Sequence, residues 1–231
     1  MTLRHRAATV CFVAAVALPI VAVPAPAGAA TSGAATAPFG QPVTVGDARQ
    51  ILTVKSRPGS SYATLSGWVV RNGRWVRNLG PMPARVGARG TTSSPREGLS
   101  ATPRGTYRLT EAFGTKAAPA ATKLPYRRVR IQSWWVSDPR SRYYNTYRYG
   151  PPNGQWNPAY GEQLSRYRTA YAYAIVIDFN RSPVVRGKGS AIFLHVGTGG
   201  ATAGCVSVSS ARMAQLLRYV TPRLEPRIAI G

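Results

Sequence analysis

The apolar and polar positions of this 231-residue chain predict mostly strands and turns after about residue 46. Two segments, 171–179 (YAYAIVIDF) and 190–196 (SAIFLHV), are almost continuously apolar, which is typical of central strands buried on both faces. Residues 102–113 (TPRGTYRLTEAF) predict a turn that leads into a strand, and RIAI near the C-terminus predicts a last strand. The pattern therefore indicates a mostly-β chain.

One hairpin can be placed from its turn residues. Asn72 and Gly73 in GWVVRNGRWVR suit a two-residue turn. That turn pairs Val70 with Trp75, and it pairs Val69 with Val76.

One helix is expected near the C-terminus. In SSARMAQLLRYVTP, serine caps precede the apolar stripe and Pro222 provides a stop. The apolar residues at helical spacing are Met213, Leu216, Leu217 and Val220. Such a stripe is typical of a helix face that packs on the core.

The N-terminus is typical of an export signal. A positively charged start precedes an apolar run from Ala7 to Val23, and APAGAA follows as a small-residue cleavage region. We predict a signal peptide over 1–29, a tether over 30–45 that is rich in Ala, Pro, Thr and Gly, and one domain over 46–231. The alternative is an uncleaved anchor, which would hold the protein at the membrane.

The net charge of the chain indicates what kind of partner it binds. The chain has 30 Lys and Arg against 7 Asp and Glu, so its surface attracts anions. Segment 126–152 interleaves Arg with Tyr and Trp, as a base-stacking platform does, but export argues against nucleic acid. Anionic cell-wall polymers or membrane headgroups fit an exported protein better. A solvated, composition-biased surface is the plain alternative.

Candidate chemistry lies in AIFLHVGTGGATAGCVSVSS, residues 191–210. With His5 and Cys11 in the predicted signal, His195 and Cys205 are the single His and Cys of the exported chain. A free thiol in an oxidising compartment is a candidate nucleophile. If the two flanking strands form an antiparallel hairpin, His195 stands directly opposite Cys205, within contact distance.

The alternation of side chains supports this interpretation. Val206 and Val208 share one face of their strand and leave Cys205 on the other. An adjacent imidazole lowers the pKa of a thiol, and we therefore expect Cys205 to be more acidic than a free thiol. A backbone carbonyl is expected to orient the ring, and Gly204 to offer backbone N–H groups to an oxyanion. Two ligands are too few for a metal site, and no cofactor is expected.

These residues resemble a known family. GSAIFLHVGTGGATAGCVSVS resembles the catalytic signature of the L,D-transpeptidase (YkuD-type) domain, and TPRGTYRL resembles its Thr-Pro-x-Gly turn. The resemblance covers roughly residues 85–231. It implies a β-sandwich of mixed sheets with one or two short helices, and an acyl transfer to or from peptidoglycan stem peptides.

By this resemblance, Cys205 is the nucleophile that takes the acyl group and His195 is its base and then its acid. Gly204 supplies an oxyanion donor, and Thr202 matches the Ser or Thr of the motif. The acceptor is an amine on a neighbouring stem or water. The chain departs from the motif at Ala203, where the family commonly has a His; at Val196, where a small residue often stands; and at Ser207, where an Arg or Asn is common. The spacing from His to Cys is also shorter than usual.

Three further residues, Tyr144, Asn145 and Glu162, fall in a long aromatic segment that we expect to be irregular and to line a substrate groove or form a flap. Surface loops with buried aromatic side chains are the alternative for that segment. Two other functions stay open. One is a non-catalytic, Arg-rich wall-binding module of the same fold, and the other is an L,D-carboxypeptidase or another cysteine peptidase.

Overall fold

The computed structural model describes residues 34–35 and 38–231. The predicted signal peptide and the first part of the predicted tether lie outside these residues. Within the described part of the chain, no helix has the length and apolar character needed to cross a membrane.

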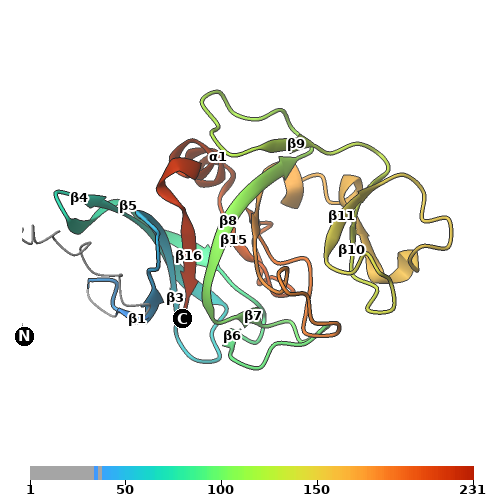
Figure 1. Ribbon diagram of the computed structural model, residues 1–231, viewed down its shortest axis with the longest axis horizontal. Helices are drawn as coiled ribbons and strands as arrows, with labels where there is room; N and C mark the ends of the chain where they lie inside the picture. The colour runs from blue at the N-terminus through green and yellow to red at the C-terminus, as the bar shows by residue number, and fades with distance from the viewer. Residues whose placement is uncertain (1–33, 36–37) are drawn as a thin grey trace, which may run out of the picture.

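Nine strands form one mixed sheet that closes on itself. They run in the order β13-β14-β15-β5-β4-β3-β16-β8-β9, and β13 also pairs with β8 (Figure 1). The strands are β3 (Gln50–Ser56), β4 (Tyr62–Arg71), β5 (Arg74–Arg85), β8 (Gly105–Gly114), β9 (Tyr126–Arg128), β13 (Ala174–Ile177), β14 (Phe193–Val196), β15 (Val206–Val208) and β16 (Arg227–Ile230). The expected mostly-β fold with mixed sheets is confirmed. The predicted strands at 171–179 and 190–196 become β13 and β14, which are adjacent and fully buried.

The main core lies inside this closed sheet. Apolar side chains from β3, β4, β5, β8, β13, β14, β15 and β16 meet there, together with one face of helix α1 (Ser210–Tyr219). Ser209 caps the helix by accepting a hydrogen bond from the N–H of Arg212, and Val220 is its C-cap. The predicted helix is thus confirmed. Four single-turn 3-10 helices are η1 (Pro158–Tyr160), η2 (Leu164–Arg166), η3 (Ala170–Ala172) and η4 (Pro222–Leu224).

The predicted hairpin joins β4 to β5. Val69 pairs with Val76 and Val70 with Trp75, as expected. Asn72 and Gly73 have φ angles of 49° and 74°, the left-handed values that a type I′ turn requires.

The aromatic segment from about residue 126 is more regular than the sequence suggested. Strand β10 (Ser133–Val136) lies between β11 (Thr146–Tyr149) and β12 (Gly161–Gln163) in a small antiparallel sheet. Figure 1 shows β10 and β11 on the opposite side of the closed sheet from the β4–β5 hairpin. Trp135 of β10 packs edge-on against Phe193 of β14, with 4.9 Å between the ring centroids. The expectation of an irregular segment is therefore wrong.

The start of the domain also needs correction. Phe39 and Val43 are buried against β3, β4, β5 and β16, and Gln41 donates a hydrogen bond to the carbonyl of Ala229. Residues 39–45 therefore belong to the folded domain and are not a tether. Two short pairings complete the fold, β1 (Ala34–Ala35) with β2 (Val43–Thr44) and β6 (Thr91–Thr92) with β7 (Thr102–Pro103).

Candidate active site

The candidate nucleophile and base lie on neighbouring strands that run parallel. β14 and β15 pair with His195 opposite Ser207 and Leu194 opposite Val206. The predicted antiparallel hairpin, with His195 directly opposite Cys205, is therefore wrong. Cys205 directly precedes β15 and is level with Phe193, so it lies on the same face as His195 but two residues along the strand.

The connection between β14 and β15 explains why the two strands run parallel. The loop after Val196 returns along the length of β14 before β15 begins. On the way Thr202 pairs with the segment that follows β5, accepting a hydrogen bond from the N–H of Ala88 and donating its own N–H to the carbonyl of Val86. The loop is thus a crossover held by backbone hydrogen bonds, which allows two parallel strands to be neighbours.

The Cys205 thiol is buried among backbone groups. It donates a hydrogen bond to the carbonyl of Ala191 at 3.2 Å and accepts one from the N–H of Phe193 at 3.4 Å. As predicted, Val206 and Val208 face the main core, while Cys205 faces a second cluster with Phe113, Tyr171 and Phe193. Burial raises the pKa of the thiol to about 12, and the Glu162 carboxylate adds to this. The expectation of an acidic thiol is wrong.

His195 is held as a neutral base. Its Nδ1 lies 2.8 Å from the carbonyl oxygen of Val196, and because a carbonyl only accepts, Nδ1 carries the proton. The expected orienting carbonyl is therefore present. Nε2 is left unprotonated, and burial lowers the pKa of the ring below its usual value. The rings of Tyr171 and His195 pack perpendicular to each other, with 5.7 Å between their centroids.

Two threonine hydroxyls fix the backbone at the nucleophile. Thr202 Oγ1 donates to the carbonyl of Cys205 at 2.6 Å, and Thr102 Oγ1 donates to the same oxygen at 3.1 Å. The N–H of Gly204 donates to Thr202 Oγ1 at 3.2 Å. Gly204 has a φ of +143°, where a side chain is strained, so a glycine is required before the nucleophile.

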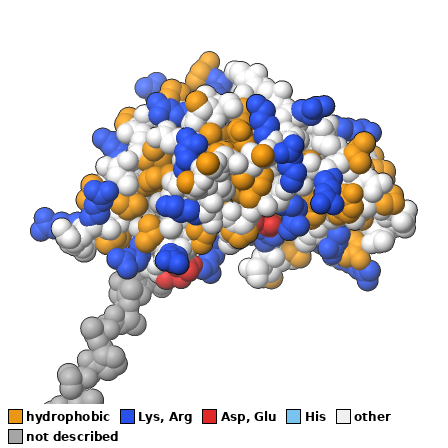
Figure 2. All heavy atoms as spheres, turned by 90° about the horizontal axis from the view of Figure 1, so that it is seen from above, with side chains coloured by type: hydrophobic (Ala, Val, Ile, Leu, Met, Phe, Trp, Pro, Cys, Tyr) orange, Lys and Arg blue, Asp and Glu red, His pale blue; other side chains and the backbone are white. Residues whose placement is uncertain are grey.

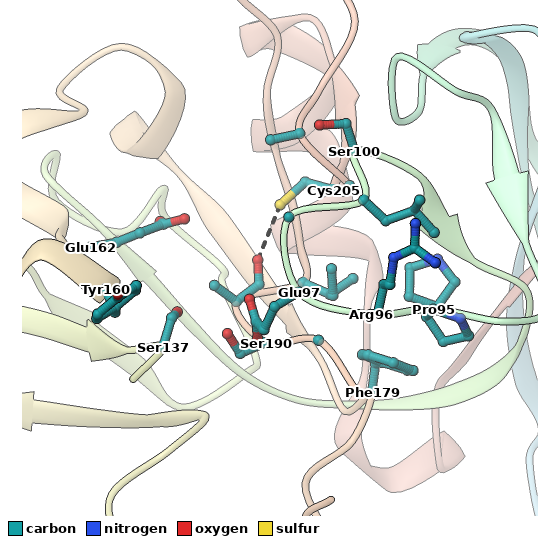
Figure 3. A pocket seen from close by; sticks show the side chains of 18 of the residues that line it. Pro95, Arg96, Glu97, Ser100, Ser137, Tyr160, Glu162, Phe179, Ser190 and Cys205 are labelled. Atoms are coloured by element: carbon teal, nitrogen blue, oxygen red, sulfur yellow. Dashed lines mark hydrogen bonds between the residues drawn. The ribbon is translucent and has the colours of Figure 1, made fainter. Parts of the chain in front are cut away.

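A pocket of about 560 Å³ opens beside the thiol. Cys205, Gly204 and Glu162 line it, whereas His195 is buried outside its wall. Figure 3 shows the carboxylate of Glu162 directed toward the Cys205 sulfur across the pocket. The candidate thiol is thus accessible to a ligand from the pocket, whereas His195 does not line it.

Glu162 lies at the centre of β12 and carries an unusual carboxyl group. It accepts a hydrogen bond from the hydroxyl of Tyr171. Burial raises its pKa to about 7, and repulsion from Glu97 contributes to the shift. Glu162 is therefore poised between its charged and neutral forms near neutral pH.

Tyr144 and Asn145 lie behind the pocket wall. The Tyr144 hydroxyl donates to Glu97 and accepts from the N–H of Gly189. The Asn145 amide accepts from Trp135 Nε1 and the Ala191 N–H, and donates to the carbonyls of Phe179 and Asn180. Their polar groups are thus engaged within the protein. This geometry favours a positioning role for both residues over the expected contact with substrate.

Sequence reasoning missed several residues of this site: Thr102, Tyr171, Glu97 and Ser190. Thr102 lies in the TPRG turn, and no residue pattern near that turn indicates that it contacts Cys205. Within the described residues, no group of three or more His, Cys, Asp or Glu side chains is arranged to hold a metal ion.

The chain belongs to the L,D-transpeptidase catalytic domain (YkuD) family, whose sequence model matches residues 63–228. A comparison with curated proteins gives no match. Among solved structures, the chain is similar to the crystal structure of the helical cell shape determining protein Pgp2 from Campylobacter jejuni, with 12% identity and a TM-score of 0.40. The similarity covers 79% of this chain and 48% of that one, so this chain spans about half of its length.

Proposed function

We propose that this protein is an exported cysteine acyltransferase that acts on peptidoglycan stem peptides. The observation that carries the proposal is the Cys205 thiol, which lines the pocket and shares a face with a neutral His195. Membership of the L,D-transpeptidase family supports the substrate class. Export rests on the signal predicted over 1–29, and the site of action is then the cell wall.

The raised pKa of the thiol and the lowered pKa of the imidazole favour a neutral pair before reaction. The thiol leaves the Ala191 carbonyl and passes its proton to Nε2 of His195 as Sγ attacks the acyl carbon. The Sγ–C bond forms, the amide C–N bond breaks, and the imidazolium returns the proton to the departing amine. A thioester on Cys205 remains.

The thioester is then attacked by an acceptor. An amine gives a new amide and a cross-link, and water gives a shortened stem peptide. In both cases His195 accepts the acceptor's proton and the thiol is released. The backbone N–H groups at Gly204 and Cys205 are the proposed oxyanion donors. The Gly204 N–H must then exchange its hydrogen bond to Thr202 for one to the oxyanion.

The products formed from a disaccharide tetrapeptide test this function. Mass spectrometry after incubation with the wild-type protein is expected to detect a cross-linked dimer or a tripeptide, and Cys205→Ala is expected to form neither. If both proteins leave the tetrapeptide unchanged while both bind isolated wall, the wall-binding module is the better account.

Binding to anionic wall polymers is a second, compatible role. A groove beside β9 and β11 is lined by Arg127, Arg128 and Arg130, and the Arg127 guanidinium stacks 4.3 Å from the centroid of Tyr147. Arg127 also pairs with Glu111 of the same groove, so the guanidinium groups of Arg128 and Arg130 are the ones proposed to bind phosphate or carboxylate anions. Retention on isolated wall is expected to fall as salt rises, and Arg128→Gln together with Arg130→Gln is expected to weaken it without changing the products above.

A further inference from the structure

The acidic residues of this basic protein are divided into two groups. Five of the seven form salt bridges with arginine: Asp47, Glu111, Asp138, Asp178 and Glu225. Glu97 and Glu162 form none with any Lys or Arg of residues 38–231, although the chain is rich in Arg. Both of these residues line the pocket beside Cys205. Figure 2 shows Lys and Arg side chains spread over the visible face, so two carboxylates without an ion pair are exceptional in this protein.

Each of the two carboxylates is held by a tyrosine. Tyr144 donates to Oε1 of Glu97 and Tyr171 donates to Oε2 of Glu162. The other oxygen of each carboxylate has no hydrogen-bond donor among the described residues. Arg96 is the one positively charged residue of the pocket lining, and Figure 3 shows it on the opposite side of the pocket from Glu162.

A buried hydroxyl in the same pocket also lacks a partner. Ser190 is only 9% exposed and lines the pocket. Its Oγ lies near the Tyr144 hydroxyl but forms no hydrogen bond of normal geometry with any described residue. Leaving a buried polar atom unpaired costs about 1–3 kcal/mol. An orphan of this kind in a pocket wall points to a ligand group that completes it.

We propose that Glu97, Glu162 and Ser190 form a subsite that binds a primary ammonium group next to Cys205. An alkylammonium has three N–H donors and no acceptor, which matches two carboxylate oxygens and one hydroxyl oxygen. The inference rests on the proposed function for the identity of the substrate, which is then a peptide with a free amine near its reacting acyl group. The charge preference of the subsite is independent of catalysis.

Thiol reagents of different charge test this preference without turnover. Cys205 is treated with cationic aminoethyl methanethiosulfonate and, separately, with anionic sulfonatoethyl methanethiosulfonate. Each rate constant is divided by the rate constant of the same reagent with a small free thiol. The thiolate attacks the reagent sulfur, a mixed disulfide forms and methanesulfinate leaves. We expect the cationic reagent to be preferred about tenfold or more in the wild type.

Matched variants locate the source of the preference. Glu97→Gln and Glu162→Gln keep the tyrosine hydrogen bonds but remove charge, and each is expected to reduce the preference severalfold, with melting curves checked for folding. A cysteine at exposed Ala118, in the Cys205→Ala background, is expected to favour the anionic reagent because the surface is basic. Where Cys205 reacts too slowly, Ala203→Cys in the Cys205→Ala background reports on the same pocket.

A wild-type pocket with no cationic preference, or a preference that survives both Gln substitutions, overturns the proposal. Its failure is distinguishable from failure of the proposed function. A protein that processes the tetrapeptide without charge preference loses only the subsite, whereas one that prefers cations but forms no product loses only the acyl transfer.

Discussion

The hydroxyl of Thr102 donates a hydrogen bond to the carbonyl of Cys205 at 3.1 Å, across 103 positions of sequence. The same hydroxyl accepts a hydrogen bond from the N–H of Gly87 at 2.8 Å. Thr102 is fully buried, so both bonds lie away from water. It therefore joins the turn before β8, the segment after β5 and the nucleophile.

Replacing Thr102 tests the contribution of these two hydrogen bonds to stability. Thr102→Val keeps the shape of the side chain but leaves the Gly87 N–H without an acceptor and removes one donor to the Cys205 carbonyl. We therefore expect a loss of about 1–3 kcal/mol in the free energy of unfolding. Thr102→Ser keeps the hydroxyl and is expected to lose less than half as much. Urea denaturation of the three proteins checks this. A Thr102→Val protein as stable as the wild type, beside a destabilised Thr102→Ser protein, would show that the methyl packing matters and the hydroxyl does not.

The reactivity of Cys205 toward iodoacetamide is expected to depend on pH in a specific way. Since burial raises the pKa of the thiol to about 12, the thiolate fraction, and with it the rate, is expected to rise about tenfold per pH unit from pH 7 to 10. The same thiol in urea-unfolded protein is expected to level off near pH 9, close to its ordinary pKa. A folded protein whose rate levels off below pH 8 contradicts the buried, protonated thiol.

Asn145 is expected to be essential for stability. Ala191 has a φ of 53°, a strained value for a residue with a side chain, and its N–H is held by Asn145 while its carbonyl accepts the Cys205 thiol. Asn145→Ala removes four hydrogen bonds of a buried amide, so we expect a loss of about 3 kcal/mol or more.

Asn153→Ala is the matched control for Asn145→Ala. Asn153 also has a left-handed backbone, with a φ of 44° against 59° for Asn145, but it is exposed. The strain of placing Ala in this conformation is therefore similar in both variants, and the difference in unfolding free energy isolates the hydrogen bonds. Similar losses of unfolding free energy in the two variants would contradict the positioning role of Asn145.

Glu162→Gln is expected to stabilise the protein at high pH. The folded-state pKa of Glu162, about 7, lies above its ordinary value of 4.5, so its contribution to stability is fully present below pH 4.5 and is lost as pH rises through 7. Gln keeps the acceptor for Tyr171 but does not ionise. Melting temperatures of wild type and variant should diverge between pH 5 and 8, with the variant higher at pH 8, and a constant difference would contradict the shifted pKa.

Local signals made part of the fold predictable. The β4–β5 hairpin follows from the demand of a tight turn for residues such as Asn72 and Gly73, and helix α1 follows from its cap and apolar stripe. The alternation of Val206 and Val208 correctly separated the core face from the face of Cys205. Each of these features depends on residues close together in the sequence.

Features that depend on distant segments were not predictable in this way. Alternation is the same in parallel and antiparallel strands, so nothing near His195 and Cys205 specified that β14 and β15 run in the same direction. The burial of Phe39 depends on Trp68 and Trp75, which lie across the sheet. The contact of Tyr171 with both Glu162 and His195 likewise depends on how the small sheet packs on the closed one.

The most direct test of the proposed nucleophile is the intact mass of the protein after incubation with a carbapenem, beside Cys205→Ala and His195→Ala. A β-lactam is an acyl donor, and thioester formation adds its full mass to the protein. We predict one adduct in the wild type, none in Cys205→Ala, and strongly slowed formation in His195→Ala. A wild-type protein that gains no mass, while Cys205 still reacts with a small alkylating reagent, would contradict an acyl-transfer site.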